Sequence, residues 1–150
     1  MKLLFVCLGN ICRSPMAEAV MKRKLADYGL EEKIYVNSAA TSSWEHGNPV
    51  HHGTQKKLKE NGIHDYQHFS MQVKEKDFHE YDWIICMDKS NLRNLVEMAP
   101  ENASAKLALL LSVVSEAGQE EVPDPYFTGD FEETYVLVDK ACEEWIKKLV

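Results

Sequence analysis

One loop decides the fold of this chain, and it reads Cys7-Leu8-Gly9-Asn10-Ile11-Cys12-Arg13-Ser14-Pro15. The apolar run before it, residues 2–6, is typical of a short buried parallel strand. The loop ends in a helix start, with Ser14 predicted as the N-cap and Pro15 as the first helical residue. Ligands of open α/β sheets bind between a strand and the helix that follows it. The loop therefore predicts both the fold class and the place of the site.

Strand and helix patterns alternate along the rest of the chain. Short apolar runs predict further strands over residues 33–38, 82–87 and 107–111. Apolar residues at helical spacing, or turn residues at the ends, predict helices over residues 15–28, 49–61, 91–98 and 135–149. This alternation predicts a single α/β domain over residues 1–150, built on a parallel sheet.

The composition excludes several classes of protein. The 150 residues are 45% hydrophobic and 27% charged, close to globular averages. A formal net charge of −7 without a basic face argues against nucleic-acid binding. No apolar run has the length of a membrane span or the form of a signal peptide. The four cysteines lack zinc-binding spacing and are too few for a disulfide scaffold, so we expect a cytoplasmic protein with reduced thiols.

The loop combines a cradle for an anion with a nucleophile. Gly9 and Asn10 tolerate the positive φ angles of a tight nest of backbone N–H groups, and the helix dipole adds positive charge. Cys7 follows the strand directly, and the same N–H groups that bind an oxyanion stabilise its thiolate. Arg13 offers a planar charged fork for two phosphate oxygens, and the Ser14 hydroxyl can also donate to the Cys7 sulfur. The pattern predicts attack of a thiolate on phosphorus.

A leaving alkoxide or phenoxide needs a proton, so a general acid must come from elsewhere in the chain. Asp124 stands between Pro123 and Pro125, which stiffen the backbone that holds its carboxyl group. Alone, an Asp-Pro pair is an ordinary turn, and a cysteine at a strand end is often a small buried hydrophobe. Together with Arg13, they indicate a catalytic set.

Residues 7–15, the triplet Asp124-Pro125-Tyr126 and the segment Met87-Asp88-Lys89-Ser90-Asn91 closely resemble the low-molecular-weight protein tyrosine phosphatases. The resemblance covers the whole chain. It implies a doubly wound four-stranded parallel sheet flanked by helices, with the phosphate-binding loop after the first strand. It also implies that Cys7 forms a cysteinyl-phosphate and that Arg13 binds phosphate and stabilises the transition state. Asp124 would protonate the leaving group and then activate water, with no metal or organic cofactor.

The resemblance assigns supporting positions around the loop. Asn10 matches a residue that braces the loop through hydrogen bonds, and its partners match Ser14, Ser38 and His68. Asp88 matches a carboxylate near the phosphate-binding arginine, and an N-cap for the next helix is a second, compatible role.

Substrate contacts are implied in the same way. Trp44 and Tyr126 match aromatic residues that wall the entrance and hold a flat phenyl ring, although ordinary loop packing is an alternative for Trp44. A bulky branched residue at Ile11 resembles the tyrosine-specific members, whereas phosphoarginine-specific relatives have threonine there. The phosphate-binding positions are Leu8, Gly9, Asn10, Ile11, Cys12 and Ser14. Phosphotyrosine-containing proteins are the expected partners of a monomer with scope for weak self-association.

Other readings stay open from the sequence. A disulfide between Cys7 and Cys12 would switch activity off reversibly, whereas Cys12 as a loop-packing residue is the alternative. A thioredoxin-coupled arsenate reductase needs two further cysteines; Cys86 suits the first, but position 93 is arginine. A silent phosphoprotein-binding module would be favoured by loss of a catalytic residue, and none is lost.

Overall fold

Four apolar segments pair into one parallel sheet in the computed structural model, which describes residues 1–114 and 118–150. The sheet order is β2-β1-β3-β4, and the strands are β1 (Lys2–Cys7), β2 (Tyr35–Ala40), β3 (Trp83–Cys86) and β4 (Lys106–Leu109). The order changes direction between β1 and β3, and ligands of such sheets bind outside the carboxyl ends of the strands at that point. The predicted four-stranded parallel α/β fold is confirmed.

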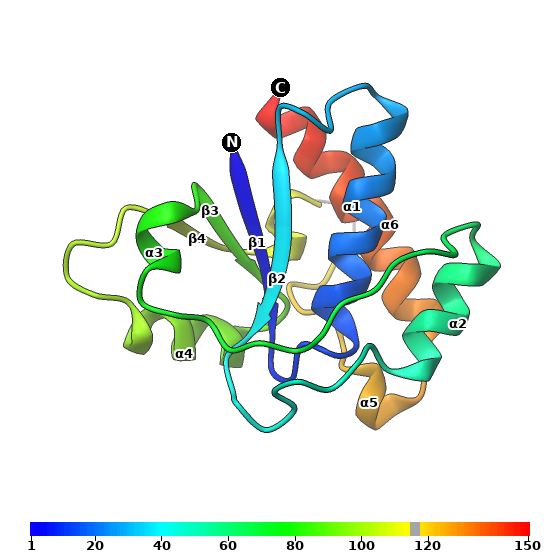
Figure 1. Cartoon of the computed structure of the whole chain (residues 1–150), viewed down its shortest axis with the longest axis horizontal. Helices are drawn as coiled ribbons and strands as arrows, with labels where there is room; N and C mark the ends of the chain where they lie inside the picture. The colour runs from blue at the N-terminus through cyan, green and yellow to red at the C-terminus, as the bar shows by residue number, and fades with distance from the viewer. Residues whose placement is uncertain (115–117) are drawn as a thin grey trace.

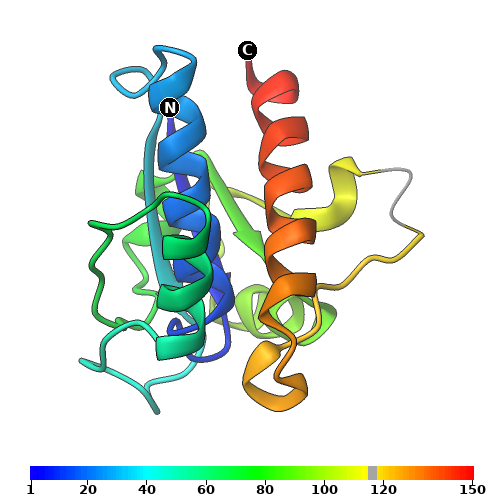
Figure 2. The same ribbon diagram turned by 90° about the vertical axis from the view of Figure 1, so that its right-hand side faces the viewer.

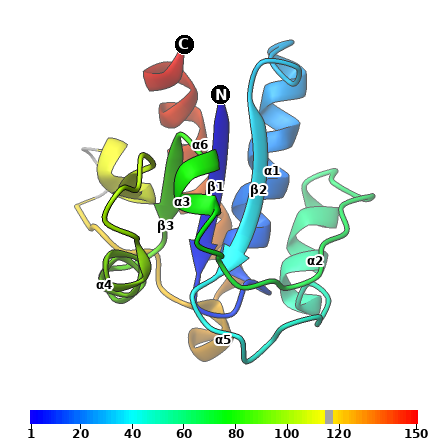
Figure 3. The same ribbon diagram turned by 60° about the vertical axis from the view of Figure 1, so that its left-hand side comes forward.

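Helices cover both faces of this sheet. They are α1 (Arg13–Asp27), α2 (His52–Glu60), α3 (Asp77–Glu80), α4 (Lys89–Met98), α5 (Pro125–Thr128) and α6 (Phe131–Leu149). The views in Figures 1 and 3 show α1 and α6 on one face and α3 and α4 on the other. Turned by 90°, the structure shows α1 and α6 running side by side, with α5 below α6 (Figure 2).

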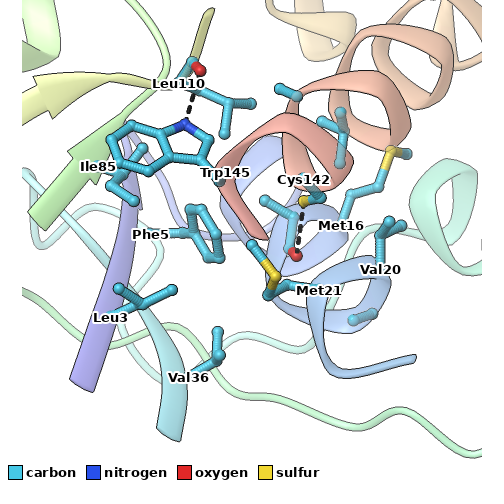
Figure 4. Close-up of a cluster of buried hydrophobic side chains, with 14 of the residues drawn as sticks. Leu3, Phe5, Met16, Val20, Met21, Val36, Ile85, Leu110, Cys142 and Trp145 are labelled. Atoms are coloured by element: carbon cyan, nitrogen blue, oxygen red, sulfur yellow. Dashed lines mark hydrogen bonds between the residues drawn. The ribbon is translucent and has the colours of Figure 1, made fainter. Parts of the chain in front are cut away.

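Strand β1 is buried on both faces, and its side chains alternate between two hydrophobic cores. Leu3 and Phe5 pack with α1 and α6, whereas Leu4 and Val6 pack toward α3 and α4. In the larger core, the indole Nε1 of Trp145 donates to the carbonyl oxygen of Leu110 at 2.8 Å (Figure 4). Because both faces of β1 are covered, its buried residues are apolar in a continuous run, and apolar and polar residues do not alternate along it.

The first helix begins differently from the prediction. Helix α1 starts at Arg13, and its N-cap residue is Cys12, whose side chain makes no capping hydrogen bond. Ser14 therefore lies inside the helix, and the expectation that it is the N-cap is wrong. Its hydroxyl bonds to the Cys7 sulfur and to Asn10 instead, so it is committed to the loop rather than to the helix end.

Other boundaries differ by a few residues. Strand β2 begins two residues later than expected, and residues after β4 form a 3-10 turn, η1 (Leu110–Val113). Helix α6 begins at Phe131 because Asp130 accepts a hydrogen bond from the backbone N–H of Glu133. The four-residue helices α3 and α5 were not predicted, since a single turn shows no helical periodicity.

Both chain termini lie at the end of the molecule opposite the carboxyl ends of β1 and β2 (Figure 1). The terminal amino group of Met1 donates to the carbonyl oxygen of Lys33, and Val150 is exposed. Within residues 1–114 and 118–150, no helix has both the length and the apolar character needed to cross a membrane.

Candidate active site

The loop between β1 and α1 folds around the sulfur of Cys7. The backbone N–H groups of Asn10 and Ser14 point at Sγ over 3.3 and 3.4 Å, and the Ser14 hydroxyl lies 3.1 Å from it. Asn10 makes the tight curve with a φ of 57°, a left-handed conformation that asparagine tolerates better than most residues. Three donors converge on one sulfur, an arrangement that suits a thiolate.

Further donors in the loop remain available to a ligand. In the part of the chain that the structure describes, no protein acceptor takes the backbone N–H groups of Gly9, Ile11 and Cys12. The Nε atom of Arg13 is buried and also lacks a protein partner. Buried donors are normally satisfied, so these atoms indicate a site for an anion with several oxygens.

Arg13 is held by two carboxylates and a carbonyl. Its Nη1 donates to Asp88 Oδ2 at 2.8 Å and to the Val122 carbonyl oxygen at 2.9 Å, and its Nη2 donates to Asp124 Oδ2 at 3.3 Å. Its side chain is only 2% exposed. These contacts fix the guanidinium plane and bring together three residues predicted from distant parts of the sequence.

Asp88 has both of the roles that the sequence left open. Its Oδ1 accepts from the backbone N–H of Asn91 at 2.8 Å, and Asn91 accepts in return from the Asp88 backbone, which completes a capping box on α4. Its Oδ2 receives the guanidinium of Arg13. The same carboxylate thus starts a helix and orients the arginine.

Asn10 is tied down by every partner expected for it. Its Nδ2 donates to Ser14 Oγ at 2.8 Å and to Ser38 Oγ at 3.1 Å. Its Oδ1 lies 2.8 Å from His68 Nε2 and accepts from the backbone N–H of Met71 at 3.2 Å. Because the amide nitrogen faces the two hydroxyl groups, His68 must donate from Nε2. Burial lowers the pKa of His68, against the opposing effect of the Glu18 carboxylate.

The sequence interpretation missed Glu18, a buried carboxylate that supports the hydrogen bonds around Asn10 through Ser38. Glu18 on α1 is buried, and its carboxylate accepts from Ser38 Oγ at 2.6 Å, from Tyr66 Oη at 2.8 Å and from Lys22 Nζ at 2.5 Å. In sequence, Glu18 and Lys22 are an ordinary i, i+4 pair of the kind found on exposed helix surfaces. Burial, followed by the charge of Glu18, raises the pKa of Tyr66.

A pocket of about 150 Å³ opens above the loop. Its floor includes Cys7 and Ile11, and its rim carries the predicted aromatic residues Trp44 and Tyr126 with Asp124. Trp44 is 77% exposed, so it is not simply packed into its loop. The sequence interpretation missed two further rim residues, Glu45 and Phe127. Each directly follows a predicted aromatic rim residue in the sequence, and this position could have indicated them.

His51 lies beside the loop between β1 and α1 and bonds to its backbone. Its backbone N–H donates to the carbonyl oxygen of Ile11 at 2.8 Å, and its Nδ1 accepts from Gly53 N at 3.0 Å as the N-cap of α2. The ring stacks on Phe131 and meets Tyr126 edge-on. Partial burial, and next the neighbouring His52, lower the pKa of His51.

All four cysteines are free thiols in the structure. Burial raises the pKa of Cys12, and the charges of Cys7 and Asp124 act in the same direction. Among the described residues, no cluster of three or more histidine, cysteine, aspartate or glutamate side chains could hold a metal ion.

Comparison with known proteins decides the family. A model of the low molecular weight phosphotyrosine protein phosphatases matches residues 2–150. The chain belongs to this family. It is 44% identical over 146 residues to the low molecular weight protein-tyrosine-phosphatase YfkJ of Bacillus subtilis, covering 97% of this chain and 94% of YfkJ. The rat low molecular weight phosphotyrosine protein phosphatase is 42% identical over 149 residues, covering 97% and 93%.

Solved structures agree with the family assignment. The crystal structure of YfkJ superposes with a TM-score of 0.94 at 43% identity, covering 99% of this chain and 94% of that one. A Drosophila arginine phosphatase superposes with a TM-score of 0.93 at 35% identity, covering 99% and 98%. The expected phosphatase class is thus confirmed for this member of the family.

Proposed function

We propose that this family member hydrolyses phosphotyrosine in proteins, and small aryl phosphates, through a cysteinyl-phosphate intermediate. The observation that carries the proposal is the convergence of the Asn10 and Ser14 N–H groups and the Ser14 hydroxyl on Cys7 Sγ. An unsatisfied Nε of the buried Arg13 lies in the same loop region. A stabilised thiolate next to free donors for phosphate oxygens supports attack on phosphorus.

In the first step, the Cys7 thiolate forms a bond to phosphorus as the bond to the tyrosine oxygen breaks. The loop N–H groups and Arg13 hold the three non-bridging oxygens. The phosphate oxygens take the place of the Asp124 carboxylate at Arg13 Nη2, and the released carboxyl group acts in its protonated form, giving its proton to the leaving oxygen. The Asp124 Oδ1 atom stays tethered to the backbone N–H of Tyr126, which keeps the carboxyl at the pocket rim.

In the second step, the Asp124 carboxylate takes a proton from water, and the resulting hydroxide attacks phosphorus. The phosphorus–sulfur bond breaks, and phosphate and the Cys7 thiolate are released. The Ser14 hydroxyl, 3.1 Å from Sγ, stabilises the departing thiolate. Each cycle returns the enzyme to its starting protonation state.

Phosphoarginine hydrolysis is the second candidate, because one similar solved structure is named an arginine phosphatase. The Ile11 side chain lines the pocket floor and favours a flat phenyl ring there over the polar guanidinium group. Arsenate reduction is disfavoured because position 93, where a relay cysteine is needed, is arginine.

Rapid-quench kinetics with para-nitrophenyl phosphate and with phosphotyrosine and phosphoarginine peptides test the proposal. We expect a burst of product equal to the enzyme concentration, no turnover by Cys7→Ser, and a loss of about 10²–10⁴-fold in Asp124→Ala. Asp65→Ala is the matched control, because Asp65 is an exposed aspartate outside the pocket, and it should keep wild-type rates. Turnover by Cys7→Ser, or preference for phosphoarginine, would contradict the proposal.

A further inference from the structure

The rim of the pocket carries a negative charge that the reaction does not use. Glu45 lines the pocket beside Trp44, and its Cγ lies 3.4 Å from where a Cβ on Gly9 would stand. Its Oε2 accepts from Asn48 Nδ2 at 2.6 Å, a neutral donor three residues along the chain. The absence of a side chain at Gly9 lets this carboxylate lie directly over the phosphate-binding loop.

Three other carboxylates near the site, those of Asp88, Asp124 and Glu120, are paired with basic side chains of the protein. Asp88 and Asp124 share the guanidinium of Arg13. Glu120 pairs with Lys89 Nζ at 2.6 Å. Glu45 has no comparable partner: in the described chain no lysine, arginine or histidine lies within 4.0 Å of its carboxylate.

No lysine or exposed arginine compensates Glu45 from the pocket wall. The described lining residues contain no lysine or arginine, and the opposite wall is aromatic, from Tyr126 and Phe127. The segment after β2 and helix α5 reach the same end of the molecule (Figures 1 and 3). A peptide whose phosphotyrosine enters the pocket must therefore pass its neighbouring residues over a rim with an unpaired carboxylate.

We propose that Glu45 makes this enzyme select phosphotyrosine sites flanked by lysine or arginine and discriminate against sites flanked by glutamate or aspartate. The inference rests on the proposed phosphotyrosine hydrolysis and adds a substrate class to it. The interaction is between exposed groups, so its effect is modest: about two- to fivefold in kcat/KM for each flanking charge. Exposed charges are screened by salt, and the preference weakens as ionic strength rises.

Three phosphotyrosine peptides of one length test the inference, with lysine, alanine or glutamate on both sides of the phosphotyrosine. The ratio of kcat/KM for the lysine peptide to that for the glutamate peptide is measured in wild type, Glu45→Gln, Glu45→Lys and Glu31→Gln. Glutamine retains an acceptor for Asn48 and removes only the charge. Glu31 is exposed in the segment between α1 and β2, and this segment lies at the end of the molecule opposite the carboxyl ends of the strands (Figure 1). Glu31→Gln therefore changes the net charge by the same amount as Glu45→Gln.

We expect the lysine peptide to be preferred by wild type and equally by Glu31→Gln. The ratio should fall toward one in Glu45→Gln and invert in Glu45→Lys. An unchanged ratio in Glu45→Gln, or an equal fall in Glu31→Gln, overturns the role of Glu45. If wild type hydrolyses all three peptides at one rate, only the charge selectivity fails. If it hydrolyses neither these peptides nor para-nitrophenyl phosphate, the proposed function fails with it.

Discussion

The hydroxyl oxygen of Ser14 lies 3.1 Å from the sulfur of Cys7, inside the first turn of α1. The same oxygen accepts from Asn10 Nδ2 at 2.8 Å, so the amide orients the hydroxyl group. The hydroxyl proton can then point at the sulfur, and the Ala39 carbonyl oxygen, 3.4 Å away, is its other acceptor. This hydroxyl group therefore links the first turn of α1 to both Cys7 and Asn10, and its removal is informative.

Replacing Ser14 by alanine should lower kcat by about 10- to 100-fold, the value of a hydrogen bond to a charged group. The thiolate would lose a donor both when it attacks and when it departs. The measurement is steady-state kinetics with para-nitrophenyl phosphate. Ser112→Ala, which removes an exposed hydroxyl on η1, should keep the wild-type kcat. A Ser14→Ala enzyme with unchanged kcat would show that this hydroxyl only packs.

Two substitutions separate the two roles of Asp88. Asparagine can still cap α4, whereas alanine cannot, so Asp88→Ala should unfold with about 1 kcal/mol less free energy than Asp88→Asn. Both lack the charge that orients Arg13, and both should lose about tenfold or more in kcat/KM. Urea denaturation and kinetics provide the measurements. Equal unfolding free energies would mean that the capping box adds no stability.

The stability of the fold should decrease below neutral pH, in part through His68. Burial holds its pKa below the unfolded value of about 6.5, so the unfolded chain binds the proton more tightly. This contribution is constant above that value and becomes more destabilising as pH falls through it. His51, whose pKa is also lowered, acts in the same direction.

The measurement is the free energy of unfolding between about pH 7.5 and 5.5. His68→Gln retains a donor for Asn10 Oδ1 and should flatten the pH dependence, whereas substitution of the exposed His64 should leave it unchanged. Glu18 and Lys22 face the ring with opposite charges, so Glu18→Gln should steepen the dependence. A His68→Gln protein with the wild-type slope would rule out His68 as its source.

Alkylation should distinguish the cysteines at neutral pH. Burial raises the pKa of Cys12 far above this range and that of Cys86 to about 12, so both remain thiols. Iodoacetamide should therefore label Cys7, which lines the pocket, and leave the others unmodified as read by mass spectrometry. Inorganic phosphate should slow this labelling. Cys12 also lines the pocket, so fast labelling of Cys12 would contradict the raised pKa of its thiol.

The sequence predicted the features that depend on local pattern. The strand before Cys7 and the alternation of strands with the longer helices were expected and are present, and the resemblance to the family placed Asp88 near Arg13, where it lies. The catalytic roles of these residues stay predictions until the kinetics are measured. Pattern works here because a buried parallel strand and a phosphate-binding loop both restrict the residue types allowed.

What the sequence did not show depends on tertiary contacts. Glu18 has the spacing of a surface ion pair, and only the packing of Tyr66 and Ser38 around it makes it a buried hub. Ser14 has the position and residue type of an N-cap, but the loop competes successfully for its hydroxyl group. Glu45 is unpaired because no basic side chain of the described residues lies within ion-pair distance of it. That depends on the tertiary fold and not on the local sequence.

Both ends of the chain lie opposite the carboxyl ends of β1 and β2 (Figure 1), and the pocket is lined by Cys7 at the end of β1 and by residues of the loop that follows it, so the position of the termini decides how the enzyme can be attached to a surface or a carrier. The Met1 amino group is engaged with Lys33, whereas Val150 is exposed at the end of α6. A carrier protein or a resin joined through the carboxyl terminus would hold the molecule with its mouth facing the solution. The carrier would then lie away from the pocket that Cys7 lines.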